Sequence, residues 1–203
     1  PSNSTLWQAC CGVVLGSAFG SGPVRFGYKQ ATGEMLTDDR ALIGCNLAIR
    51  RAVLGDMDKP FNEFMVCNGE NVLLGRLADK GVRMLYDPRI FVYHNRRETP
   101  LEFFCQIFCY GWGRGQQTFW LRQKISLLHL FPSIFILYVA AMPLFYADIR
   151  YRIPLYIYLV LNIVFSLEVV FVLKKICGGL YSFLLFPLIH IAYGSGILCA
   201  FFY

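Results

Sequence analysis

Charge is scarce in this sequence, and several common motifs are missing from it. Only 16% of the 203 residues are Asp, Glu, Lys or Arg, whereas 56% are hydrophobic, which excludes intrinsic disorder and is unusual for a soluble domain. The net charge of +6 includes no basic run, so the composition argues against nucleic-acid binding. No Gly-x-Gly-x-x-Gly or Walker sequence occurs, which excludes a complete nucleotide-binding domain of either kind.

Cysteine pairs are also missing. The eight cysteines include no Cys-x-x-Cys spacing, and three of them lie in the most apolar parts of the chain. This pattern indicates small buried hydrophobic residues in a reducing compartment rather than a metal site or a disulfide framework.

The charges that do occur are concentrated in residues 1–124, which hold 15 of the 19 basic and 11 of the 13 acidic residues. Three apolar stretches follow, at 125–147, 153–173 and 180–203. Each has about the 20 residues that a helix needs to cross a bilayer. The sequence therefore predicts three transmembrane helices after residue 124, joined by short loops at 148–152 and at 174–179.

The basic residues that flank these stretches predict their orientation. Only the basic residues next to the ends of the three predicted spans are counted. Five of them lie at ends that face the side of residues 1–124, and two, Arg150 and Arg152, lie at ends that face the other side. By the positive-inside rule, we expect an integral protein of the plasma or inner membrane with residues 1–124 in the cytoplasm. Glu168 is the single acidic residue within a span, and the nearby Lys174 and Lys175 favour a paired or snorkelling structural role for it.

The polar half of the sequence, residues 1–124, predicts an α/β fold. We expect a helix over 6–19, short strands at 35–37, 47–49, 83–86 and 90–93, and a helix over 70–80 that Asn68 caps and Gly81 ends. Between 99 and 123, aromatic and apolar residues alternate with polar ones. This last pattern predicts an amphipathic helix in the membrane interface.

One segment carries a family resemblance. Gly69-Glu70-Asn71-Val72-Leu73-Leu74-Gly75-Arg76-Leu77, followed by Tyr86-Asp87-Pro88 and Val92-Tyr93-His94, resembles the second half of membrane-bound inverting glycosyltransferases of family 2, which have the GT-A fold. Aligning the Leu and Arg-Leu positions puts Glu70 at the catalytic carboxylate. A register shifted by one residue would put Asn71 there instead.

An inverting transferase needs a carboxylate at this place. The acceptor hydroxyl displaces a nucleoside diphosphate from the anomeric carbon of the sugar, and a carboxylate within hydrogen-bond distance removes the proton of that hydroxyl. The resemblance therefore implies that Glu70 is the catalytic base. The alternative is that Glu70 only complements the positive end of a helix.

An upstream segment, Gly44-Cys45-Asn46-Leu47-Ala48-Ile49-Arg50-Arg51, resembles the family's acceptor-side element and implies an acceptor-binding role for Asn46. The favoured alternative is that Asn46 hydrogen-bonds the backbone of a neighbouring loop. The adjacent Asp38 and Asp39 are interpreted as a solvated turn, not as a metal-binding Asp-x-Asp motif.

Downstream, His94 ends a predicted strand and is followed by Arg96 and Arg97. The resemblance implies that these three residues bind the diphosphate of the donor and that His94 approaches its metal ion. The alternatives are a packed histidine at a strand end and two arginines that attract lipid head groups.

A further element, Gln106-x-x-x-Tyr110-Gly111-Trp112-Gly113-Arg114, resembles one in the family's non-processive members. It implies acceptor binding by Gln106, Trp112 and Arg114, because an indole stacks on sugar rings and guanidinium binds phosphate. Anchoring of the aromatic residues in the membrane interface is the alternative.

Together these observations predict part of a GT-A α/β domain at 1–98, the acceptor-side half, then an amphipathic interfacial helix region at 99–124 and three transmembrane α-helices at 125–203. The resemblance implies transfer of a sugar from a nucleotide-sugar donor to a lipid-linked or saccharide acceptor, with Mg²⁺ or Mn²⁺. The main metal ligands and donor-binding strands are expected before Pro1, so the chain is expected to be an N-terminally incomplete transferase that is inactive without that half. A non-catalytic membrane scaffold or degenerate transferase subunit is the competing prediction.

Overall fold

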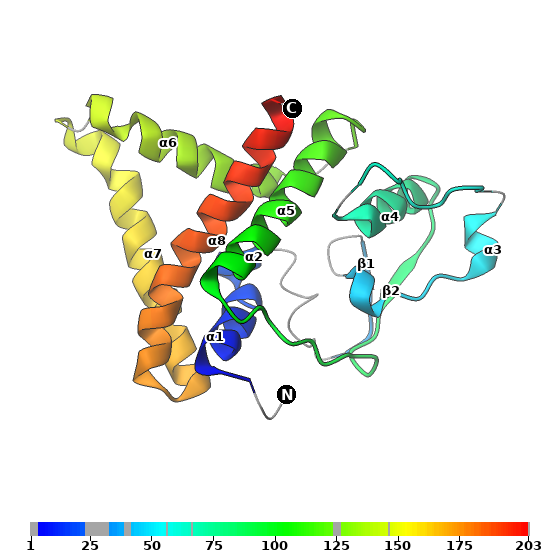
Figure 1. Ribbon diagram of the computed structural model, residues 1–203, viewed down its shortest axis with the longest axis horizontal. Coiled ribbons are helices and arrows are strands. Elements are labelled where there is room, and N and C mark those ends of the chain that lie inside the picture. The colour runs from blue at the N-terminus through cyan, green and yellow to red at the C-terminus, as the bar shows by residue number, and fades with distance from the viewer. Residues whose placement is uncertain are drawn as a thin grey trace.

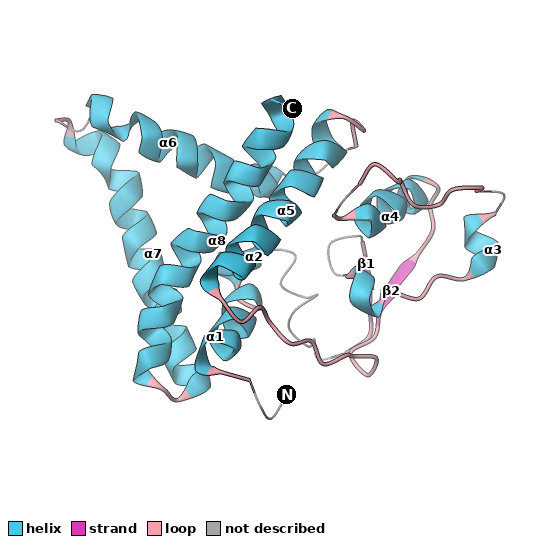
Figure 2. Cartoon of the chain, viewed as in Figure 1, coloured by secondary structure: helices cyan, strands magenta, loops and turns pink. Residues whose placement is uncertain are grey.

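The computed structural model describes residues 4–22, 33–38, 42–55, 57–65, 67–123, 127–145 and 147–202. This part of the chain is mostly helical, with a single pair of short strands (Figures 1 and 2). In chain order the elements are α1 (Leu6–Leu15), α2 (Ala18–Ser21), β1 (Met35–Thr37), the 3-10 turn η2 (Gly44–Asn46), α3 (Arg51–Leu54), α4 (Gly69–Asp79), β2 (Met84–Tyr86), α5 (Pro100–Phe119), η3 (Leu127–Leu130), α6 (Phe131–Phe145), α7 (Ile149–Leu173) and α8 (Ile176–Phe202).

Three helical spans are long and apolar enough to cross a membrane, as the sequence predicts: Leu127–Phe145, Ile149–Leu173 and Ile176–Phe202. The last begins earlier than expected, so Gly178 and Gly179 lie inside α8 and not in a loop. Lys174 makes the turn itself, in the left-handed conformation. Gly179 serves close packing instead, because a Cβ there would lie 2.7 Å from Cγ2 of Val170 on α7.

Helix α8 lies at the centre of the apolar part, with α5 side by side with it and α7 on the other flank (Figure 1). Two glycines permit the close approach of α5 and α8. A Cβ at Gly111 would lie 2.0 Å from the Tyr193 carbonyl oxygen, and one at Gly196 would lie 2.2 Å from that of Phe108. The amphipathic stretch after residue 99 is thus a helix, and one face of it packs on α8.

Helix α1 joins the core of this bundle. Cys10, Cys11 and Val14 are fully buried and belong to one hydrophobic cluster with Leu185 and Phe186 of α8. The predicted single helix over 6–19 is wrong in one respect, because the chain breaks at 16–17 and restarts as α2. The break arises where the Ser17 hydroxyl accepts from the Gly20 N–H, which caps the second helix.

The β-structure is smaller than the sequence predicts. Strands β1 and β2 pair antiparallel, with Met35 opposite Tyr86. The strands predicted at 47–49 and 90–93 are wrong: both segments are irregular, and within the described ranges neither has a partner strand to complete its hydrogen bonds. The described residues show one two-stranded sheet, which does not amount to a GT-A fold.

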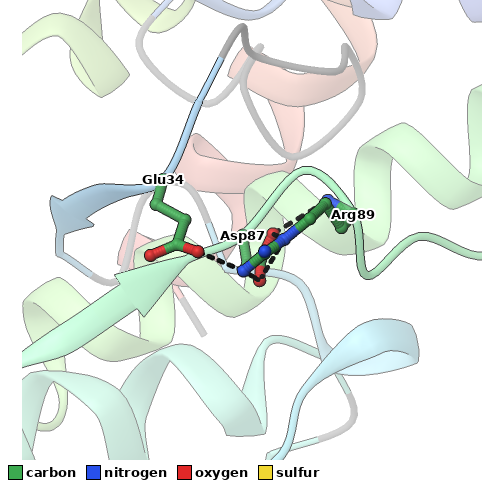
Figure 3. Close-up of polar contacts among 3 residues, drawn as sticks. All are labelled: Glu34, Asp87 and Arg89. Carbon is green, nitrogen blue, oxygen red and sulfur yellow. Dashed lines mark hydrogen bonds and ion pairs between the residues drawn. The ribbon is translucent and has the colours of Figure 1, made fainter.

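An ion-pair cluster closes the open end of the two strands (Figure 3). Arg89 lies beside Asp87, with Nε 3.0 Å from Oδ1 and Nη2 2.8 Å from Oδ2, and it also contacts Glu34. The Arg89 side chain is exposed, so water screens the pairs and they contribute little to stability. Their effect is to fix the chain as it leaves β2.

Helix α4 confirms the predicted helix over 70–80 to within a residue. Leu73, Leu74 and Leu77 bury its inner face against Met84, the first residue of β2. Asn68 precedes the helix as expected, but its side chain makes no capping hydrogen bond.

Glu168 is exposed on α7, and the part of the chain described here contains no ion pair between it and Lys174 or Lys175. Asp39 lies outside the described residues, so the structure does not test the predicted solvated turn at 38–39.

Candidate functional site

The first turn of α4 is anchored to α5. Asn68 adopts the left-handed conformation (φ 60°, ψ 23°), and its Nδ2 donates to the Tyr110 carbonyl oxygen at 2.7 Å. The segments approach closely at Gly113, where a Cβ would lie 2.6 Å from the Cys67 carbonyl oxygen. The tight turn and the contact together hold Glu70, in the first turn of α4, beside α5.

A buried polar network reinforces this anchor. Arg114 Nη1 donates to Gln117 Oε1 at 2.8 Å, and Gln117 Nε2 donates to Gln123 Oε1 at 2.9 Å. Gln123 Nε2 in turn donates to the Val72 carbonyl oxygen at 3.1 Å, and the Asn71 carbonyl accepts from Gln117 at 3.4 Å. Because buried hydrogen bonds of this kind are costly to break, the network makes the α4–α5 junction rigid.

A cavity of about 970 Å³ extends from this junction to the apolar helices. Its two ends differ in chemistry. Polar side chains from the α4–α5 side line one end, namely Asn68, Glu70, His94, Arg96, Tyr110 and Arg114. Side chains of α6, α7 and α8 line the other. Most of them are apolar, such as Phe135, Ile157, Leu161 and Ile189, but Tyr158, His190 and Tyr193 are among them.

Glu70 is half-buried and lines the polar end. Gly44 lies against it: a Cβ at this position would be 3.1 Å from the Glu70 carboxyl carbon. The upstream element that resembles the acceptor side of the family is thus in contact with the candidate base, through its glycine. Among the described residues that line the cavity, Glu70 is the one carboxylate.

The segment that carries His94 and Arg96 is held by α1. Gln8 Nε2 donates to the Arg96 carbonyl oxygen at 2.8 Å, and Trp7 Nε1 donates to the Arg97 carbonyl oxygen at 3.1 Å. These two bonds fix the backbone, so that the half-buried Arg96 and the exposed His94 line the cavity with Glu70.

Four of the predicted site residues are not brought to this cavity. Asn46 donates from Nδ2 to the Ile90 carbonyl oxygen at 2.9 Å, which is the loop-bracing role that the sequence left open. Gln106 supports the site indirectly, by donating from Nε2 to the Tyr110 hydroxyl at 2.9 Å. Trp112 packs near Phe108, and Arg97 is exposed.

Other polar residues line the cavity without having been predicted as site residues. His190 joins two segments, because its Nε2 donates to the Phe19 carbonyl oxygen at 2.9 Å while its Nδ1 accepts from the Tyr158 hydroxyl at 2.9 Å. Tyr193 on α8 lies within hydrogen-bonding reach of Arg114. The sequence does carry a signal that could have identified these residues. They are polar side chains inside apolar spans, and such side chains usually have a partner or a function.

Burial affects two ionisable groups next to Glu70. It raises the pKa of the Tyr110 phenol, and it raises the pKa of the Cys67 thiol to about 11. Both groups are therefore neutral near pH 7.

No group of three or more His, Cys, Asp or Glu residues within the described ranges is arranged to hold a metal ion. The side chains present do not form a metal site by themselves, so ligation by His94 stays a prediction and no chemical step is derived from a metal.

Known proteins offer no further assignment. No protein family, curated protein or solved structure matches the chain. The glycosyltransferase resemblance therefore rests on the sequence motifs alone.

Proposed function

We propose that the chain is part of a membrane-bound inverting glycosyltransferase that uses a nucleotide-sugar donor at the cytoplasmic face, with Glu70 as its base. One observation carries the proposal: the Glu70 carboxylate and the side chains of Arg96 and His94, which are remote in sequence, line one cavity. The same three positions are those to which the motif resemblance assigns base and diphosphate binding.

The proposed reaction uses these residues. The acceptor oxygen forms a bond to the anomeric carbon while the bond from that carbon to the diphosphate oxygen breaks and its electron pair leaves with the nucleoside diphosphate. Glu70 receives the acceptor proton. Arg96 favours the negative charge that develops on the leaving group.

The surroundings of Glu70 also support it over Asn71 as the base. An amide cannot accept the acceptor proton at neutral pH, whereas a carboxylate can. Asn71 is buried, and the contact it makes with Gln117 is through its backbone carbonyl, which any residue at this position would supply.

The test is a transfer assay on membranes that contain the full-length protein, with a panel of labelled nucleotide sugars. We expect Glu70→Gln to lower turnover by roughly 10²–10⁴-fold, the usual contribution of a general base. Asn71→Ala should have a smaller effect, and Asp79→Asn, an exposed residue at the far end of the same helix, should leave turnover unchanged.

Normal turnover of Glu70→Gln would overturn the assignment of the base. If the unaltered protein transferred no sugar from any donor in the panel, the catalytic proposal would fail and a non-catalytic membrane subunit would be the better description.

A further inference from the structure

Two cysteines lie side by side at the α4–α5 junction. Cys67 lies just before α4, and Cys109 lies within α5. The residue after each of them joins the two segments, because Asn68 Nδ2 donates to the Tyr110 carbonyl oxygen at 2.7 Å. One turn after Cys109, a Cβ at Gly113 would lie 2.6 Å from the Cys67 carbonyl oxygen. The two thiols themselves lie within hydrogen-bonding reach of each other.

The junction holds these two thiols in place. Gln117 and Gln123 both donate to backbone carbonyl oxygens of α4, so α4 keeps its position against α5. Groups that are held in contact in this way react with each other far more readily than groups that must first find each other. Cys67 lines the cavity, and both cysteines are half-buried, so a small oxidant has a path to the pair.

In a reducing compartment the pair stays as two thiols. Burial raises the pKa of the Cys67 thiol to about 11, so little of it is thiolate at pH 7. The thiolate is the reactive form, and its scarcity slows oxidation. The pair therefore closes only when a strong oxidant is supplied.

We propose that Cys67 and Cys109 form a redox modification site, at which hydrogen peroxide joins their sulfur atoms in a disulfide. The two thiols give up two electrons and two protons as the bond between the sulfur atoms forms. The oxygen–oxygen bond of the peroxide breaks as it takes up these electrons and protons, and two molecules of water leave. A dithiol reductant reverses the reaction by thiol–disulfide exchange.

A disulfide at this place displaces the candidate base. Cys67 lies three residues before Glu70 in the chain. The sulfur atoms of a disulfide are about 2.05 Å apart, which is shorter than any non-bonded contact between them, so the start of α4 is drawn toward α5. A displacement of about 1 Å in an active site can cost roughly 10²-fold in rate. If the proposed function holds, on which this consequence rests, oxidation switches the transferase off.

Peptide mass spectrometry on the full-length protein in detergent tests the bond itself. The tryptic peptide between Arg97 and Arg114 contains both Cys105 and Cys109, so the exposed Cys105 is first replaced by serine. Cys105→Ser is treated with hydrogen peroxide, its free thiols are blocked, and it is digested without reduction. We expect the peptides of Cys67 and Cys109 to be joined, and to separate in dithiothreitol. The joined peptides should be absent when Cys109→Ser is added.

Two results of this mapping would overturn the proposal. One is a disulfide from Cys67 to Cys45, an exposed cysteine that also lines the cavity. The other is the addition of oxygen atoms to Cys67 and Cys109 without a bond between them, which would mean that the two sulfur atoms do not meet.

Turnover then separates the modification from its effect. Peroxide should lower the turnover of Cys105→Ser by roughly 10-fold or more, and dithiothreitol should restore it. The same treatment should leave the turnover of the variant that also carries Cys109→Ser unchanged. Normal turnover of the cross-linked protein would overturn the switch. A protein that forms the disulfide but transfers no sugar before oxidation would refute the proposed function and leave the modification site standing.

Discussion

Gly44 leaves the space that the Glu70 carboxylate occupies. With only 3.1 Å between an added Cβ and the carboxyl carbon, Gly44→Ala forces Glu70 to move by a few tenths of an ångström or more. Catalysis is sensitive to such displacements, so we expect turnover to fall by roughly 10-fold or more. The measurement is the transfer assay together with thermal unfolding, which should change little.

The control for this prediction is Gly33→Ala, because an added Cβ there has no neighbour within 4 Å and lies outside the cavity. Equal turnover in both variants would mean that the position of Glu70 does not matter.

The Asp87–Arg89 pair supplies a pH dependence at the level of single residues. Hydrogen bonds from Arg89 hold the pKa of Asp87 below its ordinary value of 3.8. A carboxylate with a depressed pKa in the folded state contributes stability above its unfolded pKa, and that contribution is lost as the pH falls through the folded value. We expect an NMR titration to place Asp87 below 3.8 and Arg89→Gln to raise it.

Lys59→Gln removes an exposed ion pair elsewhere, the one with Glu63, and should leave the Asp87 titration unchanged. A titration of Asp87 that did not respond to Arg89→Gln would contradict the contact drawn in Figure 3.

At the scale of elements, the α5–α8 contact depends on glycine. A Cβ at Gly196 would lie 2.2 Å from the Phe108 carbonyl oxygen, and a backbone atom cannot move aside as a flexible side chain can. Gly196→Ala is therefore expected to destabilise the fold by about 1–3 kcal/mol, the usual cost of overpacking. Gly12→Ala, inside α1 and with the nearest atom 4.0 Å away, should not destabilise the fold in the same unfolding measurement in detergent, because alanine favours a helix over glycine.

The long apolar helices were predictable to within a few residues, because length and hydropathy alone decide whether a segment can span a bilayer. The strands at 47–49 and 90–93 were not, since a strand forms only where a partner completes its hydrogen bonds, and a local pattern carries no information on partners. The break at Ser17 was missed because apolar periodicity continues across it, while one hydroxyl ends the helix.

The site divides in the same way. Motif spacing singled out Glu70, His94, Arg96 and Arg114, and the structure lines one cavity with them, while their chemical roles stay predictions. The position of His190 beside Phe19 and Tyr158 could not be predicted, because it depends on how α8 is rotated against α2 and α7, which no spacing within one helix reveals.

At the scale of the whole molecule, α1 connects the polar half to the membrane helices. Cys10 and Cys11 are fully buried, and burial raises the pKa of their thiols to about 11 and about 12 from the ordinary 9.0. At pH 8 a thiol with a pKa of 11 has about 100-fold less thiolate than an ordinary one. We therefore expect iodoacetamide to label the exposed Cys105 quickly and to spare Cys10 and Cys11, as judged by peptide mass spectrometry.

Rapid labelling of Cys10 in the native protein would show that α1 is not docked. Denaturant provides the positive control, because it should bring all three residues to a similar rate.

The number of spans fixes which parts of the chain share a side of the membrane. Helix α7 has 25 residues, and at 1.5 Å per residue it is longer than the hydrocarbon core of about 30 Å. Asp148 before α7 and Lys175 after it must then lie on opposite sides. In sealed vesicles, an impermeant maleimide should label only one of Asp148→Cys and Lys175→Cys, in a background in which the exposed cysteines are serine. From the positive-inside rule we expect Lys175 on the same side as Cys105, the cytoplasmic side. If both introduced cysteines reacted from the same side, α7 would not cross the membrane.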